Sequence, residues 1–101
     1  MADRLRFHPH MVSDLRDAVS WYDEISVDLG NRFRMAVRTC FAEIAEKPNR
    51  FGRTSEGIRF ARVKRFPYVV LFEEAREAVS VLGVFHAASD PKRWKRRSSE
   101  K

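Results

Sequence analysis

The spacing of apolar residues changes abruptly half-way along this chain. Up to Ile44 they recur every three or four positions in two successive stripes, which is the period of amphipathic helices. From Ile58 to Phe85 they come instead in alternating or continuous runs, the period of β-strands. This change predicts an α+β fold, in which helices and strands form separate blocks that pack on one another.

The first half predicts two helices. The first stripe runs from Met11 to Ile25 and the second from Leu29 to Ile44, with Asp28-Leu29-Gly30 expected to interrupt them and Pro48 to end the second. Two helices of similar length joined by a short break predict an antiparallel helical hairpin. Trp21 and Tyr22, at the end of the first stripe, are predicted to pack in the core or between the two helices.

The second half, together with a short N-terminal segment, predicts four strands. Leu5 and Phe7 alternate with charged residues before the first helix, and a loop over residues 49–57 precedes a strand over 58–63. Residues 68–72 and 78–85 are apolar runs on either side of a charged turn, which predicts a hairpin with a central strand. The expected order is β-α-α-β-β-β, with the helical hairpin on one face of a small sheet whose last three strands are antiparallel.

Composition excludes several classes of protein. The chain has 101 residues, so we predict one domain over 1–101, with a core at about 4–90 and a C-terminal tail over 91–101. No apolar run is long enough for a membrane span or a signal peptide, which predicts a cytoplasmic protein. Cys40, the single cysteine, is expected to be a small core residue. No metal-ligand spacing or glycine-rich phosphate loop occurs, so we predict neither metal nor cofactor.

Positive charge is concentrated in two segments of a chain with net charge +6. The first, the basic belt, consists of Arg50, Arg53, Arg59, Arg62, Lys64 and Arg65, opposed by Glu56 alone. The second, the tail, contains Lys92, Arg93, Lys95, Arg96, Arg97 and Lys101 against Glu100. Such segments predict an anionic partner, either nucleic acid or an acidic protein. Trp94 within the tail either packs back on the body or contacts that partner.

An ordered series of residues resembles a known toxin superfamily. The series is Trp21-Tyr22, Leu29-Gly30, Phe33, Pro48, Phe51, Ile58-Arg59, Phe66-Pro67-Tyr68, Val84-Phe85-His86, Asp90-Pro91 and Trp94. Over residues 4–97 the chain resembles the RelE/ParE superfamily of type II toxin–antitoxin toxins, and it is most similar to the ParE-like, plasmid-stabilisation branch.

The resemblance implies a compact toxin fold and a protein partner. It implies that an acidic, partly disordered antitoxin wraps the toxin, relieves growth arrest and forms a hetero-oligomer with it, which agrees with the charge. The residues assigned to target or antitoxin binding are Arg50, Arg53, Arg62, Arg65, Lys92, Arg93, Trp94, Lys95, Arg96 and Arg97.

The superfamily contains two classes of target, DNA gyrase and messenger RNA on the ribosome. RNA cleavage needs a base, an acid and a cation at the phosphate, and the candidates here are Arg59, Lys64, Tyr68 and His86. Many relatives carry an arginine between the strand-end histidine and the Asp-Pro, where this chain has Ala87, Ala88 and Ser89. That departure favours gyrase inhibition through a surface that includes the tail, although it equally fits a weakened toxin.

Two alternatives stay open at this stage. One is a ribosome-dependent messenger endoribonuclease, in which Arg59 replaces the absent arginine if its side chain converges with His86. The other is a non-toxic nucleic-acid-binding module.

Overall fold

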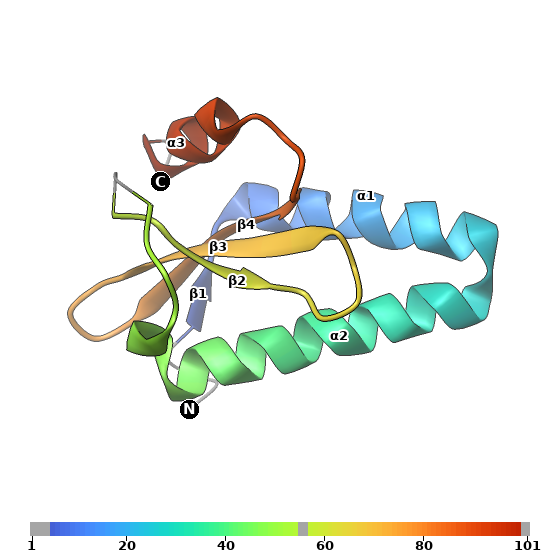
Figure 1. The fold of residues 1–101 in the computed structure, drawn as a ribbon, viewed down its shortest axis with the longest axis horizontal. Coiled ribbons are helices and arrows are strands. Elements are labelled where there is room, and N and C mark those ends of the chain that lie inside the picture. Colours follow the sequence, from blue (N-terminus) through green and yellow to red (C-terminus); the bar gives the residue numbers. More distant parts are fainter. Residues whose placement is uncertain (1–4, 55–56, 100–101) are drawn as a thin grey trace.

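The computed structural model describes residues 5–54 and 57–99, and its element order confirms the predicted α+β fold (Figure 1). The elements are β1 (Leu5–Phe7), α1 (Pro9–Ile25), α2 (Val27–Glu46), a short 3-10 turn η2 (Pro48–Arg50), β2 (Arg59–Arg62), β3 (Tyr68–Glu74), β4 (Val79–His86) and α3 (Pro91–Ser99). The predicted tail is therefore helical from Pro91, while its residues 100–101 lie outside the described part, as do residue 4 of the predicted core and Glu56 of the loop.

The break in the helical hairpin lies earlier than the sequence predicts. It falls at Ser26, which ends α1 and begins α2, and Asp28-Leu29-Gly30 is helical. Ser26 has an extended backbone, and its hydroxyl accepts a hydrogen bond from the Leu29 amide at 3.0 Å, which is the geometry of a helix N-cap. The prediction was wrong because the serine cap determines the break, whereas the glycine serves a packing contact.

Gly30 allows the two helices to approach closely near this break. A Cβ atom at Gly30 would lie 1.7 Å from Oδ1 of Asp23. That carboxylate in turn binds Arg34 of α2, with Nη2 and Oδ2 at 2.7 Å. The glycine thus makes room for an ion pair that joins α1 to α2 near their connection.

The sheet has the strand order β1-β4-β3-β2. The last three strands form antiparallel pairs, as predicted, and β1 adds a fourth strand that is parallel to β4. The pairing of β1 with β4 extends only from Val79 to Val81 of β4. Next to it, the register between β3 and β4 shifts, because Phe72 lies opposite Val81 while Leu71 lies opposite Gly83. Among the described residues, no strand lies along the outer side of β4 beyond Val81.

Two hydrophobic clusters lie on opposite faces of the sheet. One joins the sheet to the helical hairpin and contains Phe33, Ile44, Val70 and Phe72 among its buried residues. The other contains Ile58, Val69, Leu71, Leu82 and Phe85, with Trp94 of α3 packed against it. The hairpin therefore covers one face, as predicted, and α3 lies over the other (Figure 1). Because both faces are covered, β3 and β4 are almost continuously buried.

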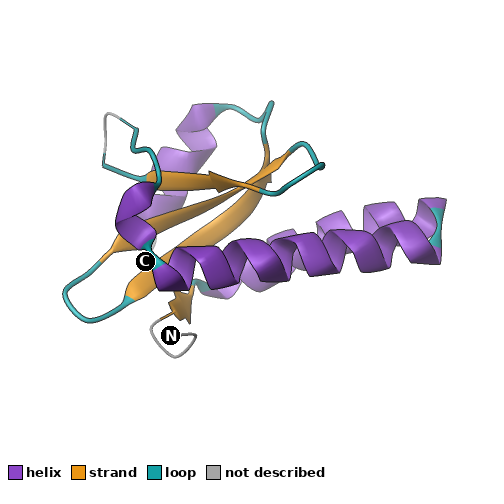
Figure 2. Cartoon of the chain, turned by 60° about the horizontal axis from the view of Figure 1, so that its bottom comes forward, coloured by secondary structure: helices purple, strands orange, loops and turns teal. Residues whose placement is uncertain are grey.

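The helical hairpin extends beyond one end of the sheet in both ribbon views (Figures 1 and 2). Tyr22 is buried as predicted, but the side chain of Trp21 is 63% exposed, so its assignment to the core was wrong.

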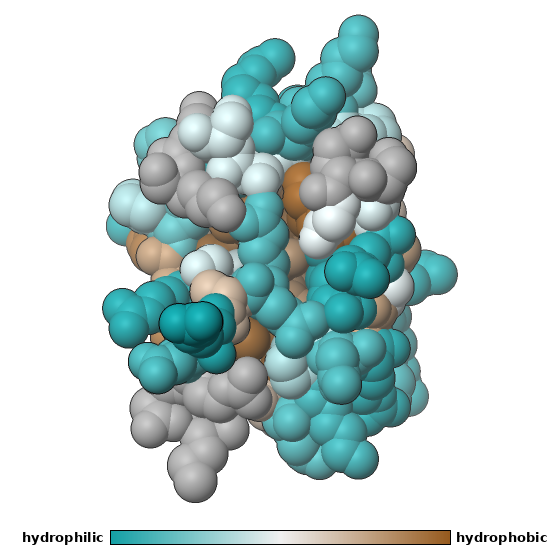
Figure 3. All heavy atoms as spheres, turned by 90° about the vertical axis from the view of Figure 1, so that its left-hand side faces the viewer, coloured by the Kyte–Doolittle hydropathy of each residue, from teal (hydrophilic) through white to brown (hydrophobic). Residues whose placement is uncertain are grey.

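The opposite end of the molecule, seen in Figure 3, is largely hydrophilic with smaller hydrophobic areas between the polar side chains. Among the described residues, no helix has the length and hydropathy needed to cross a membrane.

Candidate binding surfaces

A groove of about 470 Å³ lies between α2 and the turn that connects β2 to β3. Its apolar lining comes mainly from Leu29, Met35, Ala36, Cys40 and Phe66. Its charged lining contains four cations, Arg32, Arg62, Lys64 and Arg65, and one acid, Glu43. We call this feature the α2 groove, and its combination of apolar lining and positive charge suits a segment that is both apolar and acidic.

The β2–β3 turn positions the cations of the α2 groove. The Val63 amide donates to the Tyr68 carbonyl at 2.9 Å, and Arg65 adopts a left-handed backbone with φ of 70°. Phe66 anchors the turn, because its ring packs against those of Tyr22 and Phe33 with centroids 5.0 Å apart. The basic residues are therefore carried on a turn attached to the core.

Cys40 contributes a neutral wall to the α2 groove. It is buried, as predicted, and its thiol lies 3.7 Å from the Arg62 carbonyl oxygen. Burial, with a smaller effect from the nearby Glu43 carboxylate, raises the pKa of the Cys40 thiol to about 12. The thiol is thus protonated across the physiological range, and it does not act as a nucleophile there.

The basic belt divides in the structure. Arg62, Lys64 and Arg65 line the α2 groove, whereas Arg53 and Arg59 line a different, polar hollow with Glu73 and Glu74. Arg50 lies with its guanidinium 6.0 Å from the ring centre of Phe51. The belt is thus not one continuous binding surface, and only its C-terminal half adjoins an apolar groove.

Of the four ribonuclease candidates, Tyr68 and His86 lie together. They are directly opposite each other on β3 and β4, with ring centroids 5.3 Å apart. His86 accepts the Ala88 amide through Nδ1 at 3.0 Å, which leaves Nε2 to carry the proton of the neutral ring. Burial raises the pKa of the Tyr68 hydroxyl, so this phenol is not a base near neutral pH.

The other two candidates do not converge with this pair. Arg59 pairs across the sheet with Phe72, which places it about 13 Å along β3 from Tyr68. Its Nε donates to Glu74 Oε1 at 2.6 Å, and its side chain is only 13% exposed. Lys64 lines the α2 groove, whereas the hollow of about 300 Å³ beside Tyr68 and His86 has Arg93 as its single cationic lining residue among those described.

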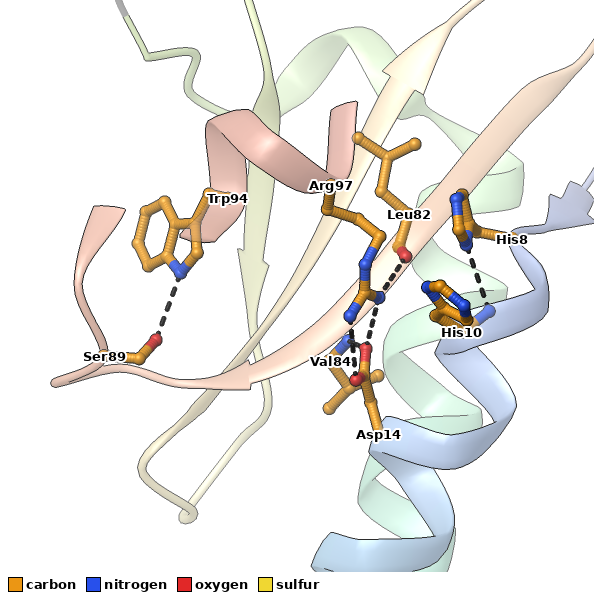
Figure 4. A network of polar contacts seen from close by, with 8 residues as sticks. All are labelled: His8, His10, Asp14, Leu82, Val84, Ser89, Trp94 and Arg97. Carbon is orange, nitrogen blue, oxygen red and sulfur yellow. Dashed lines mark hydrogen bonds and ion pairs between the residues drawn. The ribbon is translucent and has the colours of Figure 1, made fainter. Parts of the chain in front are cut away.

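The position of α3 is determined by a partly buried ion pair between residues near the two ends of the chain (Figure 4). The Arg97 guanidinium donates to both carboxylate oxygens of Asp14 on α1, at 2.7 and 3.1 Å. These side chains are only 11% and 14% exposed. A bidentate pair of this kind fixes orientation as well as distance.

The same ion pair occupies the outer edge of β4 beyond the end of β1. Arg97 donates to the Leu82 carbonyl at 2.9 Å, and Asp14 accepts the Val84 amide at 3.2 Å (Figure 4). A Cβ atom on Gly83 would lie 2.7 Å from both charged groups. The two side chains thus take the place of a neighbouring strand, and the glycine allows their close approach.

The remaining contacts of α3 divide it into an inner and an outer face. Trp94 is half-buried on the second cluster, and its Nε1 donates to Ser89 Oγ at 3.2 Å (Figure 4). Ser98 binds the Glu73 carboxylate. The inner face is thus formed by Trp94, Arg97 and Ser98. The exposed face carries Lys92, Lys95 and Arg96 in one helical stripe, whereas Arg93 lies over the ring of Phe85, with Cζ 5.4 Å from its centre.

Several residues of these surfaces escaped the sequence analysis. Arg32 and Met35 lie on the second predicted helix but outside its apolar stripe, and nothing in the pattern marks them as groove residues. Asp14 is an acid on an amphipathic helix, which is ordinary. Gly83 did carry a signal, because a glycine inside an apolar strand indicates close approach by another group. Among the described residues, no three His, Cys, Asp or Glu side chains are grouped to hold a metal ion.

Comparison with known proteins gives a consistent picture. No family model matches the chain. It is 29% identical over 92 residues to proteins named Toxin ParE2 from two strains of Mycobacterium tuberculosis, CDC 1551 / Oshkosh and H37Rv, covering 90% of this chain and 88% of each relative. Its fold matches a chain of the chromosomal ParDE toxin–antitoxin system of P. aeruginosa with a TM-score of 0.54 and 24% identity, covering 81% of this chain and 92% of that one.

Proposed function

We propose that this chain, which is similar along most of its length to proteins named Toxin ParE2 and shares the fold of a ParDE chain, is a ParE-like toxin of a type II toxin–antitoxin pair. We further propose that a cognate antitoxin neutralises it and that its target is DNA gyrase. The similarity to Toxin ParE2 along most of both chains supports the first proposal.

The α2 groove is the observation that carries the antitoxin proposal. A partly disordered acidic segment that folds on binding must bury apolar side chains to offset the entropy it loses. The groove offers Met35, which is 67% exposed, and Phe66 as apolar contacts. The surrounding Arg62 and Arg65 favour acidic residues at the margins, where charge complementarity speeds association.

The target proposal rests on binding rather than on cleavage. The residues that RNA cleavage would require are dispersed, because Arg59 is bound to Glu74 and Lys64 lies in the α2 groove. The segment 87–89 that replaces the expected arginine forms the turn into α3, where Ser89 donates to the His86 carbonyl at 2.7 Å. This arrangement favours a toxin that occupies a surface of gyrase.

Induced expression tests the toxin and antitoxin proposals. We expect growth arrest that co-expression of the acidic protein encoded by the neighbouring reading frame relieves. An Arg62→Glu/Arg65→Glu variant should still arrest growth, but the antitoxin should relieve this arrest much less, because the introduced glutamates repel its acidic residues. The matched control Arg16→Glu/Arg38→Glu, whose exposed arginines lie on α1 and α2, should be relieved like the parent chain. Full relief of the groove variant would contradict the assignment of the α2 groove.

Purified protein tests the target. We expect inhibition of gyrase supercoiling that a stoichiometric amount of the antitoxin reverses. If no excess of the toxin inhibits supercoiling while growth arrest persists, gyrase is the wrong target.

The Tyr68–His86 pair favours one second candidate, a messenger endoribonuclease. His86 is exposed, and Tyr68 borders the same hollow as Arg93, so an imidazole, a phenol and a cation could contact one phosphate there. Toeprinting on translating ribosomes distinguishes the candidates, because a ribonuclease would produce cleavage that His86→Ala abolishes. A gyrase inhibitor would produce none, and His86→Ala would still arrest growth.

A further inference from the structure

We propose that the exposed face of α3 binds the phosphate backbone of duplex DNA. The face is formed by Lys92, Lys95 and Arg96, which are exposed and spaced so that they lie on one side of the helix. Neighbouring side chains at this spacing have Cβ atoms about 5–6 Å apart. No carboxylate forms an ion pair with these three residues within the part of the chain that the structure describes.

The face has a defined orientation because α3 is attached from its inner side. Arg97 binds Asp14 and the Leu82 carbonyl, Trp94 packs on the second cluster, and Ser98 binds Glu73. The N-terminus is capped, since Asp90 Oδ1 accepts the Lys92 amide at 3.0 Å and Pro91 occupies the first turn. The basic side chains are therefore presented from a positioned helix, which lowers the entropic cost of binding an anionic polymer.

The chemistry of the face distinguishes DNA from an acidic protein. Stable protein interfaces need a desolvated apolar or aromatic centre, and the α2 groove provides one with Met35 and Phe66. The exposed face of α3 has no apolar side chain, since Trp94, the one aromatic residue of the helix, is on its inner side. Cations alone suit a backbone that carries charge at short regular intervals and requires no apolar contact.

The contact adds to the proposed gyrase inhibition without depending on it. Gyrase acts on DNA, so a toxin that binds the enzyme also lies near a duplex, which α3 can contact. The experiment uses naked DNA without gyrase or antitoxin, so its failure would leave the proposed target untouched.

The experiment measures binding of the full chain to a fluorescent duplex of about 20 base pairs at several salt concentrations. Each phosphate contact contributes about −0.9 to the slope of log affinity against log salt, so three contacts contribute about −2.7. We expect Lys92→Gln/Lys95→Gln/Arg96→Gln to remove this contribution and to weaken binding at 50 mM salt by about tenfold or more. The conservative variant Lys92→Arg/Lys95→Arg/Arg96→Lys should keep both slope and affinity.

A charge-matched control separates the α3 face from net charge. Arg16→Gln/Arg38→Gln/Arg76→Gln removes the same charge from exposed positions on α1, α2 and the β3–β4 turn, and it should retain the slope. Equal losses in the two triple variants would overturn the proposal in favour of diffuse attraction. If the α3 triple variant instead lost binding to an acidic polyglutamate peptide while its DNA binding stayed unchanged, the face would be a protein-binding surface and the proposal would be wrong.

Discussion

The α2 groove and the exposed face of α3 are both basic, yet they differ in what lies beneath the charge. In the groove the cations surround apolar side chains such as Met35 and Phe66, whereas on α3 the cations stand alone. An acidic protein segment gains burial as well as charge complementarity only in the groove. The comparison shows that the net charge of a surface indicates the sign of its partner's charge. The apolar surface beside that charge indicates whether the partner is a protein or a nucleic acid.

The two surfaces also depend on different parts of the fold. The α2 groove is built from α2 and a turn attached to the core through Phe66. The face of α3 depends on the Asp14–Arg97 ion pair and on Trp94. The surfaces should therefore be separable by mutation.

The largest effect is expected from removing Asp14. Asp14→Ala leaves the partly buried Arg97 guanidinium and the Val84 amide without their carboxylate partner, and the cost of about 3–5 kcal/mol for breaking a fully buried pair from one side is its upper limit. Urea unfolding should show this loss, and hydrogen exchange should show residues 91–99 opening first. Binding of the antitoxin in the groove should persist. Asp17→Ala, an exposed acid on the same helix, is the control and should unfold like the parent chain.

A smaller effect is expected at Gly30, near the groove. Gly30→Ala would bring a Cβ atom within 1.7 Å of Asp23 Oδ1 and displace the Asp23–Arg34 pair, at a cost of about 1–3 kcal/mol. In an Asp23→Ala background the contacts with the carboxylate are removed and only the approach to the Cα atom of residue 23, at 3.3 Å, remains, so the same substitution should cost clearly less. The four free energies of unfolding form a double-mutant cycle. Equal costs in both backgrounds would mean that Asp23 is not the obstacle.

A moderate effect on binding, with none on folding, is expected from neutralising the groove. Arg62→Gln/Arg65→Gln should weaken binding of the antitoxin by about tenfold, or about 1.4 kcal/mol, because two rim charges act mainly on association. Calorimetry at two salt concentrations would show the loss shrinking at high salt. The α3 triple variant should bind the antitoxin nearly as tightly as the parent chain. The reverse ranking would exchange the roles of the two surfaces.

The smallest effect concerns Cys40 and appears only in alkali. Burial raises the pKa of the folded thiol to about 12 from its ordinary value of 9.0, so the thiol of the unfolded chain loses its proton first. The free energy of unfolding should therefore fall as pH rises through this window, and Cys40→Ala should remove that component. At pH 8 the folded protein should react slowly with a thiol reagent and rapidly once denatured. Fast reaction in the folded state would show that the groove exposes the sulfur.

Periodicity predicted the elements well because it reports burial directly. The stripe through Phe33 and Ile44 and the run over residues 68–72 became the buried faces of α2 and β3. The helix break at Ser26 was missed because a cap acts through one side-chain hydrogen bond. The position of Trp21 was mispredicted because an apolar stripe does not show how far its helix extends past the sheet. Trp21 is largely exposed.

The candidate surfaces were less predictable than the fold. The sequence indicated the basic belt and the tail, but it could not show that Arg59 binds Glu74 or that Arg97 reaches Asp14, 83 residues away in the chain. Long-range ion pairs have no local pattern, since their partners meet only through tertiary packing. Gly83 was the one sequence signal of a close contact at β4. Its partners, Asp14 and Arg97, are seen only in the structure, next to the register shift in that strand.

The Asp14–Arg97 ion pair has a consequence for synthesis on the ribosome. Every residue that lines the α2 groove has been translated by residue 66, whereas the exposed face of α3 is fixed only after residue 97 has emerged and met a helix made near the beginning. Chains fold as they are made, from the N-terminal part onward. The proposed antitoxin site can therefore form once β3 and β4 have completed the core beneath it, before Arg97 has positioned the proposed DNA-binding face.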